Sequence, residues 1–296
     1  MVSKCAQTPV WFIAAASSGF GHEIASNALK RGHKVIATAR KIERIQDLAD
    51  AGAHTMAFDV ASPISTIEGI AKQVFDKHSR VDYLVNTAGF ILEGSVEEVS
   101  REELYDSFNT NVFGVMNTLR AFLPYIRSQP AAANGVRATV VTFGSLGSWR
   151  GGASFSVYAM TKACVSSLAE SLHEELAPFK IRATVVEPGY FRTAFLNPGV
   201  MVQSKERIEA YNDESTPTGQ TRRRLIEVDS NQPGDVVKGC QVIVDALTAT
   251  GVTQGRDLPV RIILGKDCDH VIRDKCSQTI GILDEWKDAI RSTDHD

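Results

Sequence analysis

Cysteine is scarce in this sequence, and its spacing fits neither a disulfide framework nor a metal site. There are five cysteines, an odd number, and none of them forms a C-x-x-C pair. Zinc sites and redox motifs use such close pairs, and disulfide-rich domains carry many cysteines in a short chain. We therefore expect no metal, and a cytoplasmic protein with reduced thiols at Cys5, Cys164, Cys240, Cys268 and Cys276.

Long apolar runs and a dominant charge are also missing. No run reaches the roughly 18 residues that a membrane-spanning helix needs. The N-terminal residues lack the order of parts of a signal peptide, because their apolar stretch continues straight into a glycine turn. The net charge is −3, from 32 basic and 35 acidic residues, so no bulk field attracts nucleic acid or an anionic membrane. We expect neither as a partner.

What the sequence does contain is a regular alternation of strand-like and helix-like stretches. This alternation predicts a parallel sheet with helices on both faces and right-handed crossovers. We predict an α/β fold with one doubly wound, Rossmann-like domain over residues 1–296 and a seven-stranded parallel sheet. The predicted strands are 9–15, 33–39, 53–58, 81–86, 136–143, 181–187 and 258–264. The predicted helices are one after residues 17–21 that ends at about 31, then 41–51, 63–78, 100–128, a helix from 156, 233–250 and 267–291.

The alternation stops between residues 190 and 232, where the sequence is polar, charged and rich in turn formers. A segment of this length without clear elements is usually a lid or a binding loop in a compact domain. We predict a substrate-binding lid at about 190–232.

A tyrosine and a lysine lie one helical turn apart in the predicted helix that begins at residue 156. Tyr158 and Lys162 therefore stack on one face, while apolar residues form a stripe on another. An ammonium near a phenol favours the phenolate and lowers its pKa toward the working range. Ser145 ends the preceding strand, where its hydroxyl can bind a polarised oxygen. Such a Tyr–Lys pair also arises by chance, so its surroundings must decide.

The first strand turns into the first helix through Ser17-Ser18-Gly19-Phe20-Gly21. Free backbone N–H groups and a helix dipole attract a diphosphate there, and small residues allow close approach. Two glycines could equally serve a tight turn alone. Arg40 follows the second strand, where an arginine accommodates a 2′-phosphate and an acidic residue would bind a 2′-hydroxyl. The alternative for Arg40 is a solvated surface position.

These pieces, in this order, resemble the short-chain dehydrogenase/reductase family over nearly the whole chain. The family's Thr-Gly-x-x-x-Gly-x-Gly motif is matched from Ala14 to Gly21, and its Asn-Asn-Ala-Gly from Asn86 to Gly89. The resemblance implies that Asn111, Ser145, Tyr158 and Lys162 are catalytic. It implies NADP(H) as the cofactor, bound by Ser17, Ser18, Gly19, Phe20, Gly21, Arg40, Asp59, Val60, Asn86, Ala88, Gly89, Tyr158, Lys162, Pro188, Gly189, Tyr190 and Thr193.

Two departures from the family pattern fall at the glycine turn. Ala14 and Ala15 replace the usual Thr-Gly, and Thr87 replaces the second asparagine of the strand that the lost threonine normally braces. A methyl group at Ala15 is tolerated if its φ is negative and is costly if its φ is positive.

The resemblance also implies a reaction. Hydride passes from the nicotinamide to a carbonyl carbon, Tyr158 protonates the oxygen, Ser145 binds it, and Asn111 holds a water for Lys162. The later part of the chain is similar to fungal ketoreductases and, more distantly, to 17β-hydroxysteroid dehydrogenases. It thus implies reduction of a ketone on a bulky hydrophobic molecule, a polyketide- or steroid-like secondary metabolite. The candidate walls for that substrate are Leu146, Trp149, Phe155, Phe191 and Phe195.

Two other functions remain open at this stage. Relatives in secondary metabolism use the same fold to guide a cyclisation or isomerisation, and a nucleotide-binding regulator needs no turnover. The helices after residue 100 and around Tyr158 are apolar on more than one side, which indicates a homodimer or homotetramer.

Overall fold

The computed structural model describes residues 7–196 and 201–295. Its main sheet has seven strands, all parallel, in the order β3-β2-β1-β4-β6-β7-β9, as predicted. The strands of this sheet are β1 (Val10–Ala14), β2 (Lys34–Ala39), β3 (His54–Ala57), β4 (Tyr83–Asn86), β6 (Ala138–Phe143), β7 (Ile181–Pro188) and β9 (Arg261–Leu264). Residues 1–6, with Cys5, lie outside the described residues.

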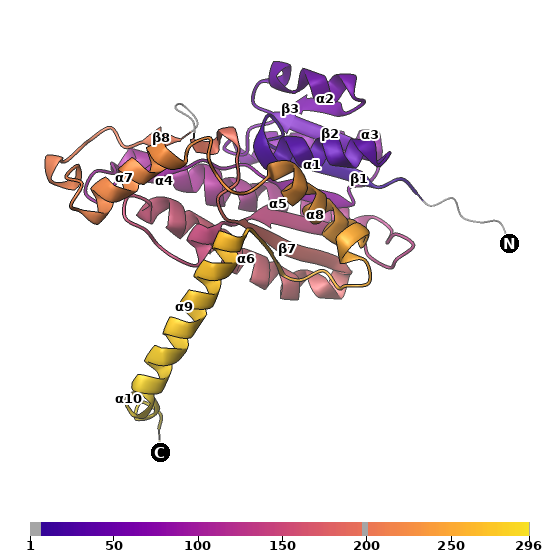
Figure 1. Cartoon of the computed structure of the whole chain (residues 1–296). Coiled ribbons are helices and arrows are strands. Elements are labelled where there is room, and N and C mark those ends of the chain that lie inside the picture. The colour runs from indigo at the N-terminus through magenta and orange to yellow at the C-terminus, as the bar shows by residue number, and fades with distance from the viewer. Residues whose placement is uncertain (1–6, 197–200, 296) are drawn as a thin grey trace.

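Helices cover both faces of the sheet (Figure 1). The α-helices are α1 (Gly19–Lys30), α2 (Gln46–Asp50), α3 (Ile64–His78), α4 (Arg101–Phe108), α5 (Gly114–Ser128), α6 (Ser156–Leu176), α7 (Pro217–Val228), α8 (Val236–Thr248), α9 (Lys266–Glu285) and α10 (Lys287–Arg291). Short 3₁₀ segments are η1 (Ile42–Ile45), η3 (Leu146–Ser148), η4 (Ala177–Phe179), η5 (Ala194–Leu196), η6 (Glu209–Tyr211) and η7 (Gly251–Thr253), and η2 (Asn109–Phe113) is a π-helical turn.

The alternation of side chains along β1 divides the core into two layers. Phe12 points toward the layer with α3, α5 and α6, whereas Trp11 and Ile13 point toward the layer with α1, α2 and α8. All three are fully buried, because both faces of a parallel sheet are covered by crossover helices. This double burial explains why β1 is apolar along its whole length.

The predicted helix over 100–128 contains an irregular turn. It begins with a capping box between Ser100 and Glu103, and it passes through the π-helical turn η2 before α5. An added Cβ at Gly114 would lie 2.8 Å from Val60, so the helix and the end of β3 meet closely there. Such π turns inside helices often mark functional sites, and this one carries Asn111.

The segment after β7 has more regular structure than the sequence indicated. It holds β8 (Val202–Gln203), which pairs in parallel with β5 (Leu92–Glu93) in a second, two-stranded sheet, and it also holds α7. Part of the predicted lid, residues 197–200, lies outside the described residues.

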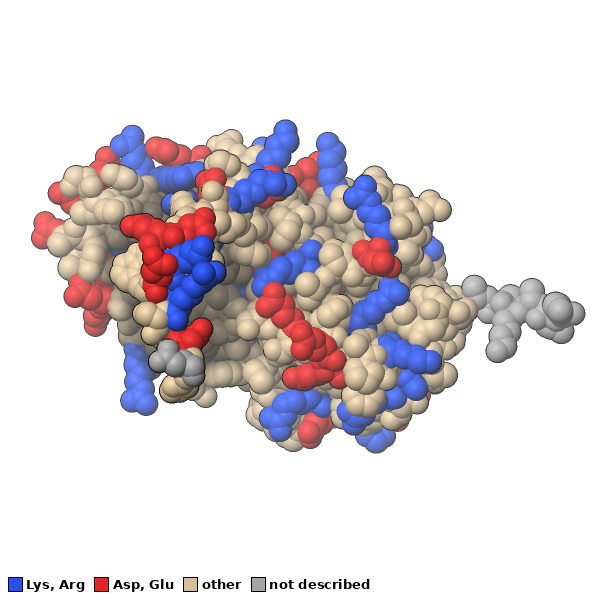
Figure 2. Space-filling view, turned by 90° about the horizontal axis from the view of Figure 1, so that it is seen from below, with Lys and Arg blue, Asp and Glu red and all other residues tan. Residues whose placement is uncertain are grey.

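The last helices leave the body of the protein (Figure 1). The predicted helix over 267–291 is divided into α9 and α10 at Trp286, and Cys268 at its start is buried, whereas Leu283 and Trp286 are exposed. None of the helices within residues 7–196 and 201–295 is long and apolar enough to cross a membrane. On the face shown in Figure 2, basic and acidic side chains are interspersed rather than sorted by sign.

Candidate active site

Three of the predicted catalytic side chains, Ser145, Tyr158 and Lys162, meet at the carboxyl end of β6. Ser145 follows that strand, and Tyr158 and Lys162 lie one turn apart on α6. The Nζ atom of Lys162 lies 5.7 Å from the centroid of the Tyr158 ring, and it donates a 2.8 Å hydrogen bond to the carbonyl oxygen of Phe143. Ser145 and Tyr158 also lie close together, because an added Cβ at Gly147 would lie 3.6 Å from Tyr158 Cε1 and 3.7 Å from Ser145 Oγ. The packing of α6 on β6 therefore assembles this cluster.

Burial shifts the pKa values of Tyr158 and Lys162 in opposite directions. Desolvation raises the pKa of the Tyr158 phenol to about 12, although the neighbouring Ser145 hydroxyl opposes the rise. Desolvation also lowers the pKa of the Lys162 ammonium to about 8. The sequence predicted a lowered pKa for Tyr158; that was wrong for this structure, because desolvation dominates. At neutral pH Tyr158 is therefore a protonated phenol that can donate its proton.

Asn111 lies beside this cluster, with its amide already engaged. Its Nδ2 donates to the Phe90 carbonyl at 3.0 Å and to Thr161 Oγ1 at 3.1 Å, and its Oδ1 accepts from the Phe90 N–H at 3.0 Å. An added Cβ at Gly89 would lie 3.2 Å from Asn111 Oδ1 and 3.3 Å from Lys162 Nζ. The two side chains thus flank the same glycine, and a water held by Asn111 for Lys162 stays a prediction.

A contact from the end of β4 replaces the threonine that is missing from the turn after β1. Thr87 Oγ1, at the end of β4, donates to the Ala14 carbonyl at 2.7 Å, so the brace between the two strands now comes from the opposite side. Ala15 has a φ of 64°, in the left-handed region that favours glycine. An added Cβ at Gly21 would lie 2.5 Å from both the Ala15 carbonyl and Thr87 Oγ1, so only glycine fits there.

The N-terminus of α1 is open to an anion. Its N-cap residue Ser18 makes no side-chain capping bond within the described residues, so the N–H groups of the first turn are free of that competitor. Thr193, from the chain after β7, approaches this turn, because an added Cβ at Gly19 would lie 3.6 Å from its side chain. The ring of Phe20 instead packs between Phe143 and Phe191, with centroid separations of 5.5 and 5.2 Å.

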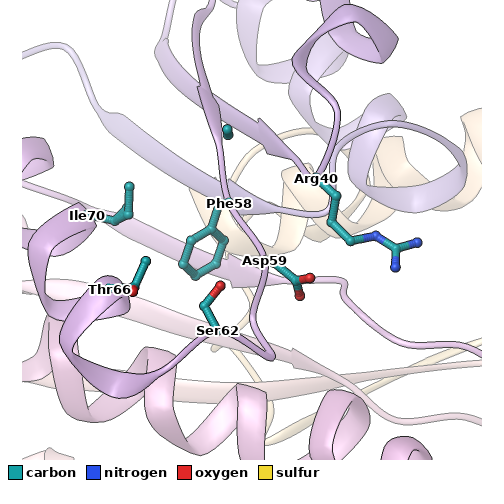
Figure 3. A pocket seen from close by; sticks show the side chains of 7 residues that line it. Arg40, Phe58, Asp59, Ser62, Thr66 and Ile70 are labelled. Carbon is teal, nitrogen blue, oxygen red and sulfur yellow. The ribbon is translucent and has the colours of Figure 1, made fainter.

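A pocket of about 260 Å³ lies beside this turn at the ends of β2 and β3. Figure 3 shows Arg40 and Asp59 at one side of it and Phe58 and Ile70 at the other. Arg40 is exposed and forms no salt bridge with any residue in the described ranges. A free guanidinium beside a partly apolar pocket suits a phosphorylated ribose and a flat base.

The end of β4 supplies a further polar group. Asn86 is buried, and its Oδ1 accepts from the Ala88 N–H at 3.0 Å, whereas its Nδ2 has no partner among the described residues. Buried donors are rarely left unpaired. Together with the open helix N-terminus and the pocket at Arg40, this donor fits a nucleotide along the carboxyl edge of the sheet.

The turn after β7 is held by a residue that the sequence analysis missed. Asp267, in the first turn of α9, accepts a 2.6 Å hydrogen bond from the Tyr190 N–H. An added Cβ at Gly189 would lie 2.1 Å from the same carboxylate, so Pro188-Gly189 fits tightly against it. An aspartate at a helix start was visible in the sequence, but its contact with a distant turn was not.

An apolar cluster adjoins Tyr158. The Phe195 and Tyr158 ring centroids are 6.3 Å apart, and Phe155 and Tyr190 pack with them against buried Leu225. Leu146 is partly buried directly after Ser145. Two of the predicted walls, Phe155 and Phe195, are therefore in this cluster.

The other two aromatic candidates have packing partners elsewhere. Trp149 donates from Nε1 to Glu187 at 2.9 Å, and its ring lies 4.8 Å from the Arg261 guanidinium. Phe191 packs against Phe20, and an added Cβ at Gly239 of α8 would lie 2.7 Å from its ring. These contacts explain both aromatic residues without a substrate.

Comparison with known proteins agrees with this geometry. The family model described as short chain dehydrogenase matches residues 9–201. The chain belongs to this family. It is 26% identical to a protein named Oxidoreductase BOA17 of Botryotinia fuckeliana, over 95% of this chain and 97% of that one. It is 32% identical to a 3-ketodihydrosphingosine reductase of Bacteroides thetaiotaomicron, over 70% of this chain and 73% of that one.

Solved structures give the same fold. A short-chain dehydrogenase from Streptomyces avermitilis is 36% identical, with a TM-score of 0.85 over 98% of this chain and 100% of that one. Two members from Burkholderia, solved with NAD and with NADP, have TM-scores of 0.73 and 0.68 at 20% and 19% identity, covering 90% and 94% of this chain and 92% and 97% of theirs. The chain is thus an oxidoreductase of a family whose fold binds nicotinamide cofactors.

Replacing Ala15 with glycine should stabilise the protein. The left-handed conformation at this position costs a residue with a Cβ about 1 kcal/mol, which glycine avoids. We expect the free energy of unfolding in urea to rise by about that amount, and calorimetry to show NADP⁺ affinity that is unchanged or higher. Ala16→Gly is the matched control, because Ala16 is buried and does not have a positive φ, so this change should destabilise. Weaker NADP⁺ binding by Ala15→Gly would contradict the expectation.

Proposed function

We propose that this protein is an NADPH-dependent reductase of a ketone carried by a bulky apolar molecule. The observation that carries the proposal is Tyr158, a phenol with a raised pKa that lies beside Ser145 and near the buried Lys162 ammonium. An apolar cluster that includes Phe155, Phe195 and Leu225 adjoins the phenol. A proton donor next to an apolar wall suits the carbonyl of a hydrophobic substrate.

The reduction divides between cofactor and protein. A bound nicotinamide supplies the hydride. Tyr158 donates its proton to the carbonyl oxygen, and Ser145 donates a second hydrogen bond that orients this oxygen. Lys162 stabilises the negative charge that remains on the Tyr158 oxygen, because its ammonium is held near the ring in a dry site.

The cofactor site proposed here runs along the carboxyl edge of the sheet. The α1 N-terminus would bind the diphosphate, Arg40 the 2′-phosphate, and Lys162 the ribose hydroxyls. The full set of proposed cofactor residues is Ser17, Ser18, Gly19, Phe20, Gly21, Arg40, Asp59, Val60, Asn86, Ala88, Gly89, Tyr158, Lys162, Pro188, Gly189, Tyr190 and Thr193.

A secondary metabolite of polyketide or steroid type is the proposed substrate class. The apolar cluster at Tyr158 supports an apolar substrate, and a relative named 3-ketodihydrosphingosine reductase supports a ketone on such a molecule. The candidate walls retained for this role are Leu146, Phe155 and Phe195. A panel of such ketones would test the assignment by NADPH consumption.

We propose residues 190–232 as a lid over this site. Leu225 of α7 and Leu196 of η5 are buried in the cluster that contains Tyr158. Arg222 and Arg207 bind the carboxylates of Glu93 and Glu98, which are fully buried below the lid; the Arg222 Nε to Glu93 Oε1 distance is 3.0 Å.

Burial raises the pKa of Glu98, but hydrogen bonds from the Ile208 and Ser95 N–H groups and Arg222 outweigh it and lower this pKa to about 2. The carboxylate is therefore charged at neutral pH and keeps the ion pair.

Homodimers or homotetramers are proposed as the assembly. Large apolar side chains are exposed on α4, α5 and α6, among them Tyr105, Met116 and Met160. A single 32.2 kDa species in light scattering at micromolar concentration would contradict this.

Arg222→Met should loosen the lid. It leaves Glu93 and Glu98 buried without one of their cations, which costs about 3–5 kcal/mol. We expect faster hydrogen exchange in residues 201–228 and a higher KM for the ketone, with the KM for NADPH unchanged. Arg223→Met is the control, since Arg223 is exposed and, among the described residues, forms salt bridges only with exposed Glu214 and Glu227. Equal exchange rates in the two variants would refute the lid.

Arg40→Asp should reverse the cofactor preference. The change removes the guanidinium and places a carboxylate where the 2′-phosphate would bind. We expect at least a tenfold rise in the KM for NADPH, roughly the loss of one charge-assisted contact, and little change with NADH. Arg44→Asp, on the following 3₁₀ segment, controls for the change of net charge. Similar losses with both cofactors after Arg40→Asp would rule out the assignment.

Tyr158→Phe tests the central proposal. It removes one hydroxyl and retains the ring, so packing changes little. Without a proton donor the rate of ketone reduction should fall by about 10²–10⁴. NADPH binding, followed by fluorescence, should be nearly unchanged because Lys162 remains. Ketone reduction at the wild-type rate would overturn the proposal.

The same variant separates the alternatives. An enzyme that guides a cyclisation or isomerisation without net hydride transfer would keep much of its product formation while consuming no NADPH. A nucleotide-binding regulator would show neither activity in the wild type.

A further inference from the structure

Glu187 is a fully buried carboxylate that the proposed reaction does not use. It lies near the end of β7, with 0% of its surface exposed. Three side chains from three different elements donate to it: Arg261 of β9 at 2.5 Å, Ser166 of α6 at 2.6 Å and Trp149, after η3, at 2.9 Å. Burying a charged carboxylate costs desolvation free energy even when it is paired, so we expect its position to serve a role.

A chain of hydroxyls leads from Glu187 to the backbone of Ser145. Ser166 Oγ lies 2.9 Å from Ser148 Oγ, and Ser148 Oγ accepts a 3.1 Å hydrogen bond from the Ser145 N–H. Ser166 Oγ has one proton and two acceptors within reach, Glu187 Oε1 at 2.6 Å and Ser148 Oγ. Ser148 accepts from the Ser145 N–H and from Ser166, and these successive bonds can polarise one another.

The same hydroxyls also contact the helix that carries Tyr158 and Lys162. Ser148 Oγ donates its proton to the Lys162 carbonyl oxygen, at 3.0 Å. Ser166 is one turn beyond Lys162 on α6. These hydrogen bonds therefore join the backbone of Ser145 to the backbone of Lys162 and reach the Glu187 carboxylate.

Close packing leaves this chain little freedom. An added Cβ at Gly144 would lie 2.6 Å from Ser166 Oγ, 2.9 Å from Ser148 Oγ and 3.0 Å from Glu187 Cγ. Gly144 joins Phe143, whose carbonyl holds Lys162, to Ser145. The three hydroxyl and carboxylate groups thus lie directly against the residue between the two anchor points of the site.

We propose that Glu187, acting through Ser166 and Ser148, is a positioning residue that sets Ser145 against Tyr158. The inference rests on the proposed reductase function. It assigns no contact with substrate or cofactor to Glu187. Its role is to hold the start of η3 and the middle of α6 at one distance, so that the Ser145 hydroxyl stays beside the Tyr158 ring across Gly147.

The kinetic test uses Ser148→Ala, Ser166→Ala and Glu187→Gln with NADPH and a ketone that the wild type reduces. Misplaced catalytic groups lower kcat, and we expect a loss of about 10- to 100-fold with an unchanged KM for NADPH. Should Glu187→Gln fail to fold, the two serine variants carry the test. A kcat within twofold of the wild type for Ser148→Ala and Ser166→Ala would overturn the proposal.

Matched controls come from the same elements. Glu170→Gln removes the other, exposed partner of Arg261, and Ser171→Ala removes an exposed hydroxyl on α6. Neither touches the chain, so both should keep the wild-type kcat. In a double-mutant cycle, Ser148→Ala combined with Glu187→Gln, or with Ser166→Ala if Glu187→Gln does not fold, should lose no more than the worse single variant. Losses that multiply would show that these residues act independently.

A readout without turnover separates this inference from the proposed function. In protein labelled with ¹³C-tyrosine, the Tyr158 signal is identified by its absence in Tyr158→Phe. This signal should shift in Ser148→Ala and Ser166→Ala, because the position of the Ser145 hydroxyl relative to the phenol changes, and not in Ser171→Ala. An unshifted signal would reject the positioning role even if no ketone proved to be a substrate, and a shifted signal in an inactive wild type would reject only the reductase proposal.

Discussion

Burial of the Lys162 ammonium between α6 and the end of β6 is the constraint on which the site depends. Only 5% of its surface is exposed, and no carboxylate is among the causes of its lowered pKa. Its charge is met by the Phe143 carbonyl and by the nearby ring of Tyr158. Both contacts require that α6 does not shift along β6. The packing that forms the core therefore also places the reactive groups.

The sheet was predictable because most of its strands are apolar runs at local positions in the sequence; β3 (His54–Ala57), whose side chains are partly buried or exposed, is the exception. The second sheet was not, since β5 and β8 pair only Leu92 with Val202 and Glu93 with Gln203. Two residues cannot show a period, and their partners are far apart in the chain. The irregular turn at Asn111 was missed for a related reason: a π-helical turn depends on what packs beside it, here Val60 against Gly114.

Part of the candidate site could be read from the sequence in the same way. Tyr158, Lys162 and Arg40 were found from local spacing and from their places at strand ends. Trp149 and Phe191 carry the same apolar signal whether they face a ligand or a neighbouring element, and the structure gives both a packing partner. The sequence does show Glu187 as a carboxylate at the end of an apolar strand. Its hydrogen-bond partners, however, come from elements that no local sequence pattern connects.

Buried carboxylates recur around the carboxyl edge of the sheet, and each binds an arginine from a distant part of the chain. Glu93 and Glu98 hold Arg222 of α7, and Glu187 holds Arg261 of β9. Such pairs add little net stability, because desolvation offsets their attraction. These pairs instead restrict how the elements can be arranged. Apolar burial is non-directional, whereas a paired carboxylate accepts its donors only in a narrow geometry. The core can thus tolerate apolar exchange of similar volume, while the loops above it depend on a few charges that leave no other arrangement satisfied.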